Sequence, residues 1–332
     1  LVGGCAAQKD KELVREKAPW VDVVIGTHNL TNVVDLLNRS EDWGPITEII
    51  DEIETLPTEA PSIRESEYSA WLTIQIGCNN SCTFCIVPST RGPELSRSSE
   101  AIVSEVRQLT AAGVREITLI GQNVNSYGLK VAGERTFAQL LYAVSDVEGV
   151  ERIRYTTSHP RDMGPDVIQA YRDLPKLTSH LHLPVQSGSS RVLRRMKRFY
   201  TRERFLEVVD QLRDAGPDIV LSTDFIVGFP GETDEDFGQT IEVMNEVKFD
   251  SAFNFKYSSR RGTKASEYED KVQEEHDDEN VELLYDNENI IKNINSDTSS
   301  EYSDSGSESE SEYSISDDDS EYDSDESDFS DI

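Results

Sequence analysis

The chain has 332 residues, which is enough for one large domain with additional segments. No apolar run reaches membrane-spanning length, so the sequence excludes a chain that crosses a membrane through a long apolar helix. The net charge of −32 is unevenly placed: residues 286–332 hold 17 acidic residues and one lysine, and thus half of the total.

The first part of the chain, residues 1–50, is predicted to be the end of a small α/β unit. Residues 51–68 are polar, show no regular pattern and are predicted to form a linker. Because the chain starts at Leu1 rather than Met, we expect a fragment that lacks its N-terminus, and with it any targeting signal. The predicted elements of the small unit are strands at residues 1–5 and 21–26 and helices at residues 9–17 and 32–38.

Residues 69–265 are predicted to form an α/β domain, because apolar strands alternate with amphipathic helices. Six such strands indicate a parallel sheet. The expected strands cover residues 71–76, 116–120, 152–157, 180–185, 219–227 and 252–257, and the expected helices residues 100–112, 137–147, 165–172, 202–214 and 235–247.

The end of the chain has a different composition. Residues 266–285 are interpreted as a degenerate helical extension, and residues 286–332 as a low-complexity tail of Ser, Asp, Glu and Tyr. Such a segment cannot bury enough apolar surface to offset its ordering entropy, so we expect disorder. It is interpreted as a solvating acidic tail or as a set of phosphorylation targets for an acid-directed kinase.

Three of the four cysteines form the pattern C-x3-C-x2-C, as Cys78, Cys82 and Cys85. Cysteine thiolates hold iron–sulfur clusters, and three of them would leave one iron of a 4Fe–4S cube open to a small molecule. A zinc site would need a fourth ligand, and none follows at a suitable spacing. A disulfide would leave one of the three unpaired. The pattern favours the cluster over zinc or structural thiols.

Polar residues stand at the C-terminal ends of the predicted strands, where (β/α) barrels carry their active sites. His159 is interpreted as a site residue or as a satisfied strand-end histidine, and Asp224 as a buried polar residue or a pocket residue. The strand-end residues are Cys78, Gln122, Asn123, Ser158, His159, Gln186, Ser187, Gly228, Phe229 and Pro230.

Four sequence segments, taken in their order along the chain, resemble a known family. They are GCNNSCTFCIVPSTRG (77–92), TLIGQNVNSYG (118–128), HLHLPVQSGSSRVLRRMKR (180–198) and STDFIVGFPGETDEDF (222–237). The chain resembles the radical S-adenosylmethionine (SAM) methylthiotransferases, and GQNVNSYG is most similar to the branch that acts on N6-isopentenyl-adenosine in tRNA. The opening VGGCAAQK resembles the end of that family's N-terminal cluster domain.

The resemblance implies a partial, six-unit (β/α) barrel with a 4Fe–4S cluster and SAM as cofactors. Cys78, Cys82 and Cys85 would hold the SAM-binding cluster. The reaction would add a methylthio group at C2 of the modified adenosine beside the anticodon. The implied partners are a tRNA substrate and an electron donor such as flavodoxin or ferredoxin, and we expect a cytoplasmic monomer with no membrane partner.

The same resemblance assigns residues that contact SAM. Gly121 and Gln122 match the region near its amino group, although the pair also fits a simple strand-end turn. Gln186 and Ser187 would line the SAM pocket. Gly228 lies in the segment that resembles the adenine-contacting strand, for which a core strand followed by a turn is the alternative.

A basic run stands out in this acidic chain and is a candidate for contacts with RNA phosphates. One of its arginines is a candidate for holding the SAM carboxylate, and a solvated helix face is the alternative. The RNA-binding candidates are Arg191, Arg194, Arg195, Lys197 and Arg198.

Two features depart from the family. Cys5 matches the last of three ligands of an auxiliary 4Fe–4S cluster, and the other two would lie upstream, so one cluster is expected here and two in the family. The family's C-terminal RNA-binding TRAM domain is replaced by the acidic tail. The sequence therefore predicts a methylthiotransferase with impaired activity. The alternatives are action on threonylcarbamoyl-adenosine or a ribosomal protein, and a non-catalytic fragment or acidic interaction protein.

Overall fold

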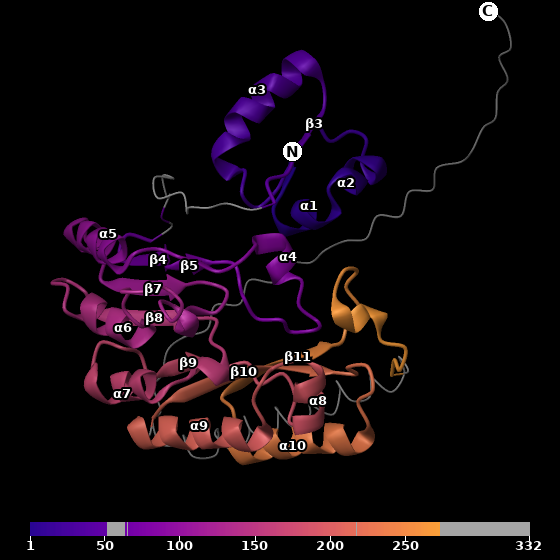
Figure 1. The fold of residues 1–332 in the computed structure, drawn as a ribbon. Coiled ribbons are helices and arrows are strands. Elements are labelled where there is room, and N and C mark those ends of the chain that lie inside the picture. Colours follow the sequence, from indigo (N-terminus) through magenta and orange to yellow (C-terminus); the bar gives the residue numbers. More distant parts are fainter. Residues whose placement is uncertain (52–63, 65, 217, 273–332) are drawn as a thin grey trace, which may run out of the picture.

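The computed structural model describes residues 1–51, 64, 66–216 and 218–272. The predicted tail and most of the predicted linker and helical extension therefore lie outside the described residues. Within these ranges the chain forms a small N-terminal α/β unit that lies above a larger barrel (Figure 1). No helix in this part of the chain is both long and apolar enough to cross a membrane.

The N-terminal unit contains a parallel sheet in the order β1-β2-β3. The predicted helix over residues 9–17 is two helices, because Lys11 adopts a positive φ of 46° between them. The third strand, β3, was not predicted from the sequence. The elements are β1 (Val2–Gly3), α1 (Cys5–Asp10), α2 (Glu12–Lys17), β2 (Val23–Ile25), η1 (Leu30–Asn32), α3 (Val33–Trp43) and β3 (Ile46–Glu48).

The larger part is an open barrel of parallel strands, and this confirms the predicted α/β class. One half has the order β4-β7-β8 and the other β9-β10-β11. A parallel bridge between Ile153 and Leu177 joins the halves next to β9. The strands are β4 (Ser69–Thr73), β7 (Glu116–Ile120), β8 (Arg152–Thr156), β9 (His180–His182), β10 (Val220–Val227) and β11 (Ser251–Lys256).

Helices cover the outer face of this sheet (Figure 1). Several begin at a side-chain cap, such as Thr136 and Thr233, each of which forms a capping box with the residue three positions on. The covering helices are α5 (Ser99–Ala111), α6 (Phe137–Ser145), α7 (Pro165–Asp173), α9 (Arg202–Ala215) and α10 (Asp234–Val247).

Smaller elements interrupt the repeat after the C-terminal ends of the barrel strands. The predicted strand over residues 71–76 is divided into β4 and β5, and β5 pairs with β6 in the antiparallel sense. The short helix α4 was not predicted from the sequence, and α8 was considered only as the solvated helix face that is the alternative for the basic run. The elements are β5 (Gln75–Ile76), α4 (Val87–Arg91), β6 (Leu95–Ser96), η2 (Val124–Ser126), η3 (Pro160–Asp162), α8 (Ser190–Arg195) and η4 (Lys264–Glu267).

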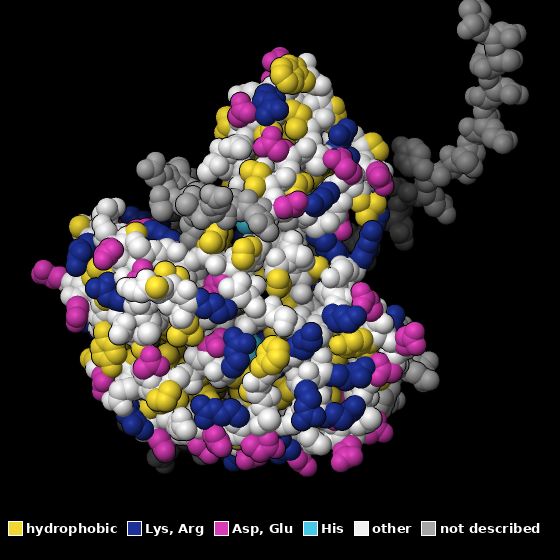
Figure 2. Space-filling model, viewed as in Figure 1, with side chains coloured by type: hydrophobic (Ala, Val, Ile, Leu, Met, Phe, Trp, Pro, Cys, Tyr) yellow, Lys and Arg dark blue, Asp and Glu magenta, His cyan; other side chains and the backbone are white. Residues whose placement is uncertain are grey.

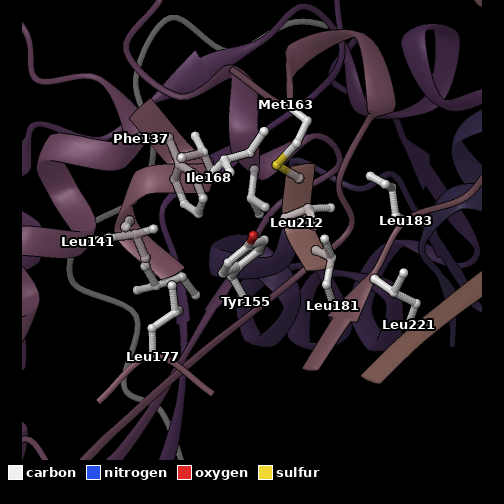
Figure 3. Close-up of a cluster of buried hydrophobic side chains, with 14 of the residues drawn as sticks. Phe137, Leu141, Tyr155, Met163, Ile168, Leu177, Leu181, Leu183, Leu212 and Leu221 are labelled. Atoms are coloured by element: carbon white, nitrogen blue, oxygen red, sulfur yellow. The ribbon is translucent and has the colours of Figure 1, made fainter. Parts of the chain in front are cut away.

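The hydrophobic core lies between the sheet and the covering helices (Figure 3). Tyr155 of β8 stands near its centre, with the edge of its ring against Phe137 at a centroid distance of 4.9 Å. Its buried hydroxyl accepts a hydrogen bond from Tyr171 at 2.7 Å, so the polar atom is not left unpaired. This packing fixes the strands whose C-terminal ends carry the polar residues.

Candidate functional site

The three cysteines of the C-x3-C-x2-C pattern lie on the loop that follows β5. Gly77 precedes them with a φ of +72°, and a Cβ on it would stand 2.0 Å from the backbone oxygen of Pro93, so this turn requires glycine. The Thr83 amide donates to the Met196 carbonyl at 3.0 Å, and its hydroxyl donates to the Arg195 carbonyl at 3.1 Å. The loop is thereby tied to the end of α8.

All three cysteines line one cavity of about 300 Å³, which we call the cysteine cavity. The other lining residues come from the cysteine loop and the start of α4, from the segments that follow β7, β8 and β9, from β10 and from the segment after α8, as expected for an active-site edge. They are Asn80, Phe84, Val87, Gly121, Gln122, Thr157, Ser158, His159, Pro184, Gln186, Arg198 and Asp224.

A larger hollow of about 760 Å³ lies at the opposite end of the barrel, where β7 and β8 begin. Arg107, Arg115, Glu148 and Glu151 are among its lining residues. It contains neither cysteine nor histidine, and the starting ends of barrel strands serve stability rather than catalysis. The smaller cysteine cavity is therefore the better candidate site.

The thiols of the cysteine cavity are partly buried. Burial raises the pKa of Cys78 and of Cys85, although backbone amides of Asn80 and Val87 act in the opposite direction. A buried thiolate needs a compensating cation, and iron supplies one when a cluster binds.

Arg198 brings a cation to the same place. Its guanidinium points at the Cys82 sulfur, with Nη1 at 3.6 Å, and Nη2 donates to the Pro184 carbonyl at 3.0 Å. It also lies 5.5 Å from the centre of the Tyr200 ring. Arg198 is only 6% exposed, so it is buried and cannot contact RNA phosphates as predicted from the basic run. Its partners make it a cysteine-cavity residue.

His159 lines the cavity and has one unpaired ring nitrogen. Its Nδ1 accepts a hydrogen bond from the Arg161 amide at 3.2 Å, so Nε2 carries the proton of the neutral ring. That Nε2 is buried and has no partner among the described residues. Burial, with help from Arg198 and Arg161, lowers the pKa of His159 to about 2, which keeps the ring neutral.

The predicted residues after β7 and β9 also reach the cavity. A Cβ on Gly121 would lie 2.9 Å from Gln75 Cγ, so the backbone there leaves no room for a side chain. The Gln122 Oε1 is buried without a partner among the described residues. Gln186 holds a positive φ of 74°, an uncommon conformation that residues at functional sites often adopt.

Two predicted residues stand behind the cavity rather than in it. Ser187 is fully buried, and its Oγ accepts a hydrogen bond from the Ser189 amide at 3.2 Å, so it shapes the turn before α8. Gly228 has a φ of 69°, and its amide donates to Glu232 Oε2 at 2.6 Å. Neither residue lines the cavity in this structure.

The remaining basic candidates differ in whether an acidic side chain pairs with them. Arg191 pairs with Asp236, and Arg195 pairs with Asp270 at 2.6 Å. Arg194 and Lys197 are exposed, and no ion pair to them occurs within the described residues. Figure 2 shows Lys and Arg side chains gathered over the part of the barrel that carries α8.

Cys5 lies apart from the other three cysteines. It is exposed in the N-terminal unit, and its sulfur accepts a hydrogen bond from Arg91 Nε at 3.1 Å. Arg91 belongs to α4, the helix that follows the cysteine loop, and Thr27 also binds this helix through the Thr90 carbonyl at 2.7 Å. Cys5 is therefore positioned next to the barrel but outside the cavity.

The donor set of the cavity suits a cluster better than a single ion. Within the described ranges no three His, Cys, Asp or Glu side chains converge closely enough to hold one metal ion. The cysteines of a 4Fe–4S cube each bind a different iron, so they stand around a larger group. The open cavity between them, with unpaired polar atoms on Gln122 and His159, leaves space for that group and a polar ligand.

An open parallel barrel with three cysteines at the C-terminal edge of its strands defines the class of this protein. The chain belongs to the radical SAM superfamily, whose family model matches residues 72–244. Members of this superfamily use a 4Fe–4S cluster and SAM, in agreement with the expected cofactors.

The chain is similar to bacterial tRNA-2-methylthio-N(6)-dimethylallyladenosine synthases. It is 49% identical over 275 residues to that of Thermobifida fusca and 50% identical over 272 residues to that of Acidothermus cellulolyticus. Each match covers 82% of this chain and 56% or 55% of the relative. The chain thus spans about half the length of the curated relatives it matches.

Solved structures support the fold alone. The cobalamin-dependent SAM radical enzyme OxsB, with aqua-cobalamin and SAM bound, matches with a TM-score of 0.56 and 16% identity. That match covers 85% of this chain and 43% of the OxsB chain.

Proposed function

We propose that this chain is part of a radical SAM methylthiotransferase that modifies C2 of an N6-isopentenyl-adenosine beside the tRNA anticodon. The observation that carries the proposal is the identity of about 50% to synthases of that name over 82% of the chain. The three cysteines lie within residues 72–244, which the family model matches, and they line one cavity together with strand-end residues such as Gln122 and Gln186.

In this proposal Cys78, Cys82 and Cys85 hold the cluster, which supplies the electron that cleaves SAM when both are bound. Arg198 donates to the Cys82 sulfur and places a permanent positive charge beside the cluster. His159 offers an N–H donor, and Gln122 offers an acceptor, to the polar groups of SAM. Phe84 and Val87 supply an apolar part of the cavity wall.

The RNA contacts are assigned to the exposed members of the basic run. Arg194 in α8 and Lys197 just after it are exposed, and Phe199, which is 61% exposed, follows Lys197 by two residues; we call these three residues the rim. Cations neutralise phosphates, and an exposed aromatic ring stacks on an unpaired base, so this set fits a single-stranded RNA loop. The donor of electrons is proposed to be a flavodoxin or ferredoxin, and the reaction is placed in the cytoplasm of a monomeric enzyme.

The test is anaerobic reconstitution followed by three measurements on one sample: iron and sulfide content, formation of 5′-deoxyadenosine, and mass analysis of an anticodon hairpin that carries N6-isopentenyl-adenosine. We expect about four irons per chain, as in one 4Fe–4S cluster, and cleavage of SAM. Cys78→Ala should abolish both, with an unchanged circular dichroism spectrum. A wild-type chain that binds no iron would exclude the proposal.

A further inference from the structure

The middle of the cysteine loop, residues 79–81, is attached to the end of a barrel strand through a side chain. The Asn80 Oδ1 accepts a hydrogen bond from Arg161 Nη2 at 2.8 Å. The Asn80 amide donates to the Cys78 sulfur at 3.4 Å. Because Asn80 lies between Cys78 and Cys82 in the chain, its position helps to set where these two thiols stand.

The guanidinium of Arg161 is itself held in a fixed orientation. Arg161 belongs to η3, in the segment after β8, and it makes two hydrogen bonds to the next residue. Its Nε donates to Asp162 Oδ1 at 2.9 Å, and its Nη2 donates to Asp162 Oδ2 at 3.0 Å. A bidentate pair of arginine and carboxylate fixes the plane of the guanidinium. The Nη2 that donates to Asn80 is thereby held in place.

Asp162 is anchored from the interior of the barrel. Asn123, which is buried, donates from Nδ2 to Asp162 Oδ2 at 2.8 Å, and its carbonyl accepts from Gln75 Nε2 at 2.6 Å. Gln75 is fully buried in β5, the strand that leads into the cysteine loop. Hydrogen bonds thus run from β5 past the ends of β7 and β8 and back to the loop. We call Asn80, Arg161, Asp162 and Asn123 the polar bridge.

Burial separates the polar bridge from an ordinary surface ion pair. The side chain of Asp162 is only 10% exposed, and that of Arg161 is 33% exposed. Exposed ion pairs contribute little because water competes with them, whereas a carboxylate that has lost its water depends on its protein partners. Replacement of Arg161 would therefore take a partner from Asp162 and would leave Asn80 without its donor.

The backbone of η3 acts on a second residue of the cysteine cavity. The Arg161 amide donates to His159 Nδ1 at 3.2 Å, and the Asp162 amide donates to the His159 carbonyl at 3.0 Å. His159 and Asn80 both line the cavity. The turn η3 thus contacts the cysteine loop through one side chain and the histidine through two backbone amides.

We propose that Arg161 is a positioning residue, which holds the segment between Cys78 and Cys82 at a fixed place relative to His159 at the end of β8. The inference rests on the proposed function, because it assigns the residue that keeps the thiols, and the groups bound to them, in a constant geometry. Partners of this kind, one step away from the metal ligands, orient those ligands and tune the affinity of the site.

The role assigned to Arg161 is geometric and indirect. Arg161 does not line the cysteine cavity, so it acts through Asn80 and does not touch SAM. Its charge is balanced by Asp162, with which it pairs at 2.9 Å. Arg198 differs in both respects, since it lines the cavity and points at the Cys82 sulfur.

The experiment measures binding of SAM to the reconstituted full chain. Equilibrium dialysis against radiolabelled SAM is carried out with the cluster oxidised and at equal iron content, so the readout does not depend on turnover. We expect Arg161→Gln to raise the dissociation constant roughly tenfold, as for loss of one outer partner of a metal site. Arg161→Lys should lose nearly as much, because an ammonium keeps the charge but cannot form the bidentate pair. Full affinity in Arg161→Lys would overturn the geometric role.

A double-mutant cycle tests whether Arg161 acts through Asn80. Asn80→Ala should also weaken SAM, and the double variant Asn80→Ala/Arg161→Gln should bind no more weakly than the weaker of the two single variants. Independent effects would multiply in the dissociation constant, and that result would refute the positioning role. If Arg161→Gln does not fold, as judged by circular dichroism, Arg161→Lys replaces it in the cycle.

Arg152→Gln is the matched control. Arg152 also pairs with a carboxylate, that of Glu116 at 3.0 Å, but it stands at the opposite end of β8. Its replacement should leave the affinity for SAM unchanged. A wild type that holds no iron or binds no SAM refutes the proposed function, whereas an unchanged dissociation constant in Arg161→Gln refutes the positioning role alone.

Discussion

The neutral, buried ring of His159 predicts a specific loss of stability in mild acid. Its pKa lies at about 2 in the folded chain, against an ordinary value of 6.5, because burial and the charges of Arg198 and Arg161 disfavour the imidazolium. Below pH 6.5 the unfolded chain binds a proton that the folded chain does not, so stability falls as the pH falls from 6.5 towards 2.

The magnitude follows from these two values. Between pH 7 and pH 5 the unfolded histidine becomes almost fully protonated, which corresponds to about 2 kcal/mol of stability lost through this one group. Replacement by asparagine removes the titration, and the amide oxygen takes over the hydrogen bond that Nδ1 accepts from Arg161. The wild type should therefore lose about 2 kcal/mol more than His159→Asn over this interval.

The assay is urea unfolding of the cluster-free chain at pH 7 and at pH 5, followed by circular dichroism. Other titrating groups contribute equally to both proteins and cancel in the difference. His180→Asn serves as the control, since His180 is exposed and its replacement should change the pH dependence less. Parallel losses of stability in the wild type and in His159→Asn would refute the assignment of a neutral, buried ring.

Three further predictions concern the core, the rim and the cluster. Phe137→Ala should lower the free energy of unfolding by about 3–5 kcal/mol, because its ring is 1% exposed and packs in the core. The double change Arg194→Glu and Lys197→Glu should weaken RNA hairpins regardless of the modified base, and a titration against salt should show a slope smaller by roughly 2. Arg198→Gln removes a positive charge beside Cys82, so a redox titration followed by electron paramagnetic resonance should give a more negative cluster potential. An unchanged potential in that variant would argue against contact between Arg198 and the cluster.

The sequence by itself determined the class of fold and the cysteine loop. The alternation of apolar strands with amphipathic helices is a local pattern, and it predicted each barrel strand to within a few residues. The C-x3-C-x2-C spacing is also local. This spacing puts all three thiols in one loop whatever the tertiary contacts are, and the family match over residues 72–244 includes them.

Tertiary structure decided which polar residues reach the cavity. Arg198 and Arg194 look alike in one basic run, yet the positive φ angles of Lys197 and Phe199 turn the chain so that Arg198 points at Cys82. Ser187 and Gln186 are neighbours, and only Gln186 lines the cavity. The orientation of such a side chain depends on contacts between segments far apart in the sequence, which local periodicity does not record.

The same reason applies to the face of β11 that carries Phe253 and Phe255. A strand with alternating residues predicts two faces, but the sequence does not state which face a helix covers. Phe253 and Phe255 could equally have been core residues by composition. Their pairing with Asp224 and Ile226 turns them towards the open barrel, because register is set by the neighbouring strand. The exposure of these two rings is therefore a property of the assembled barrel and not of any single segment.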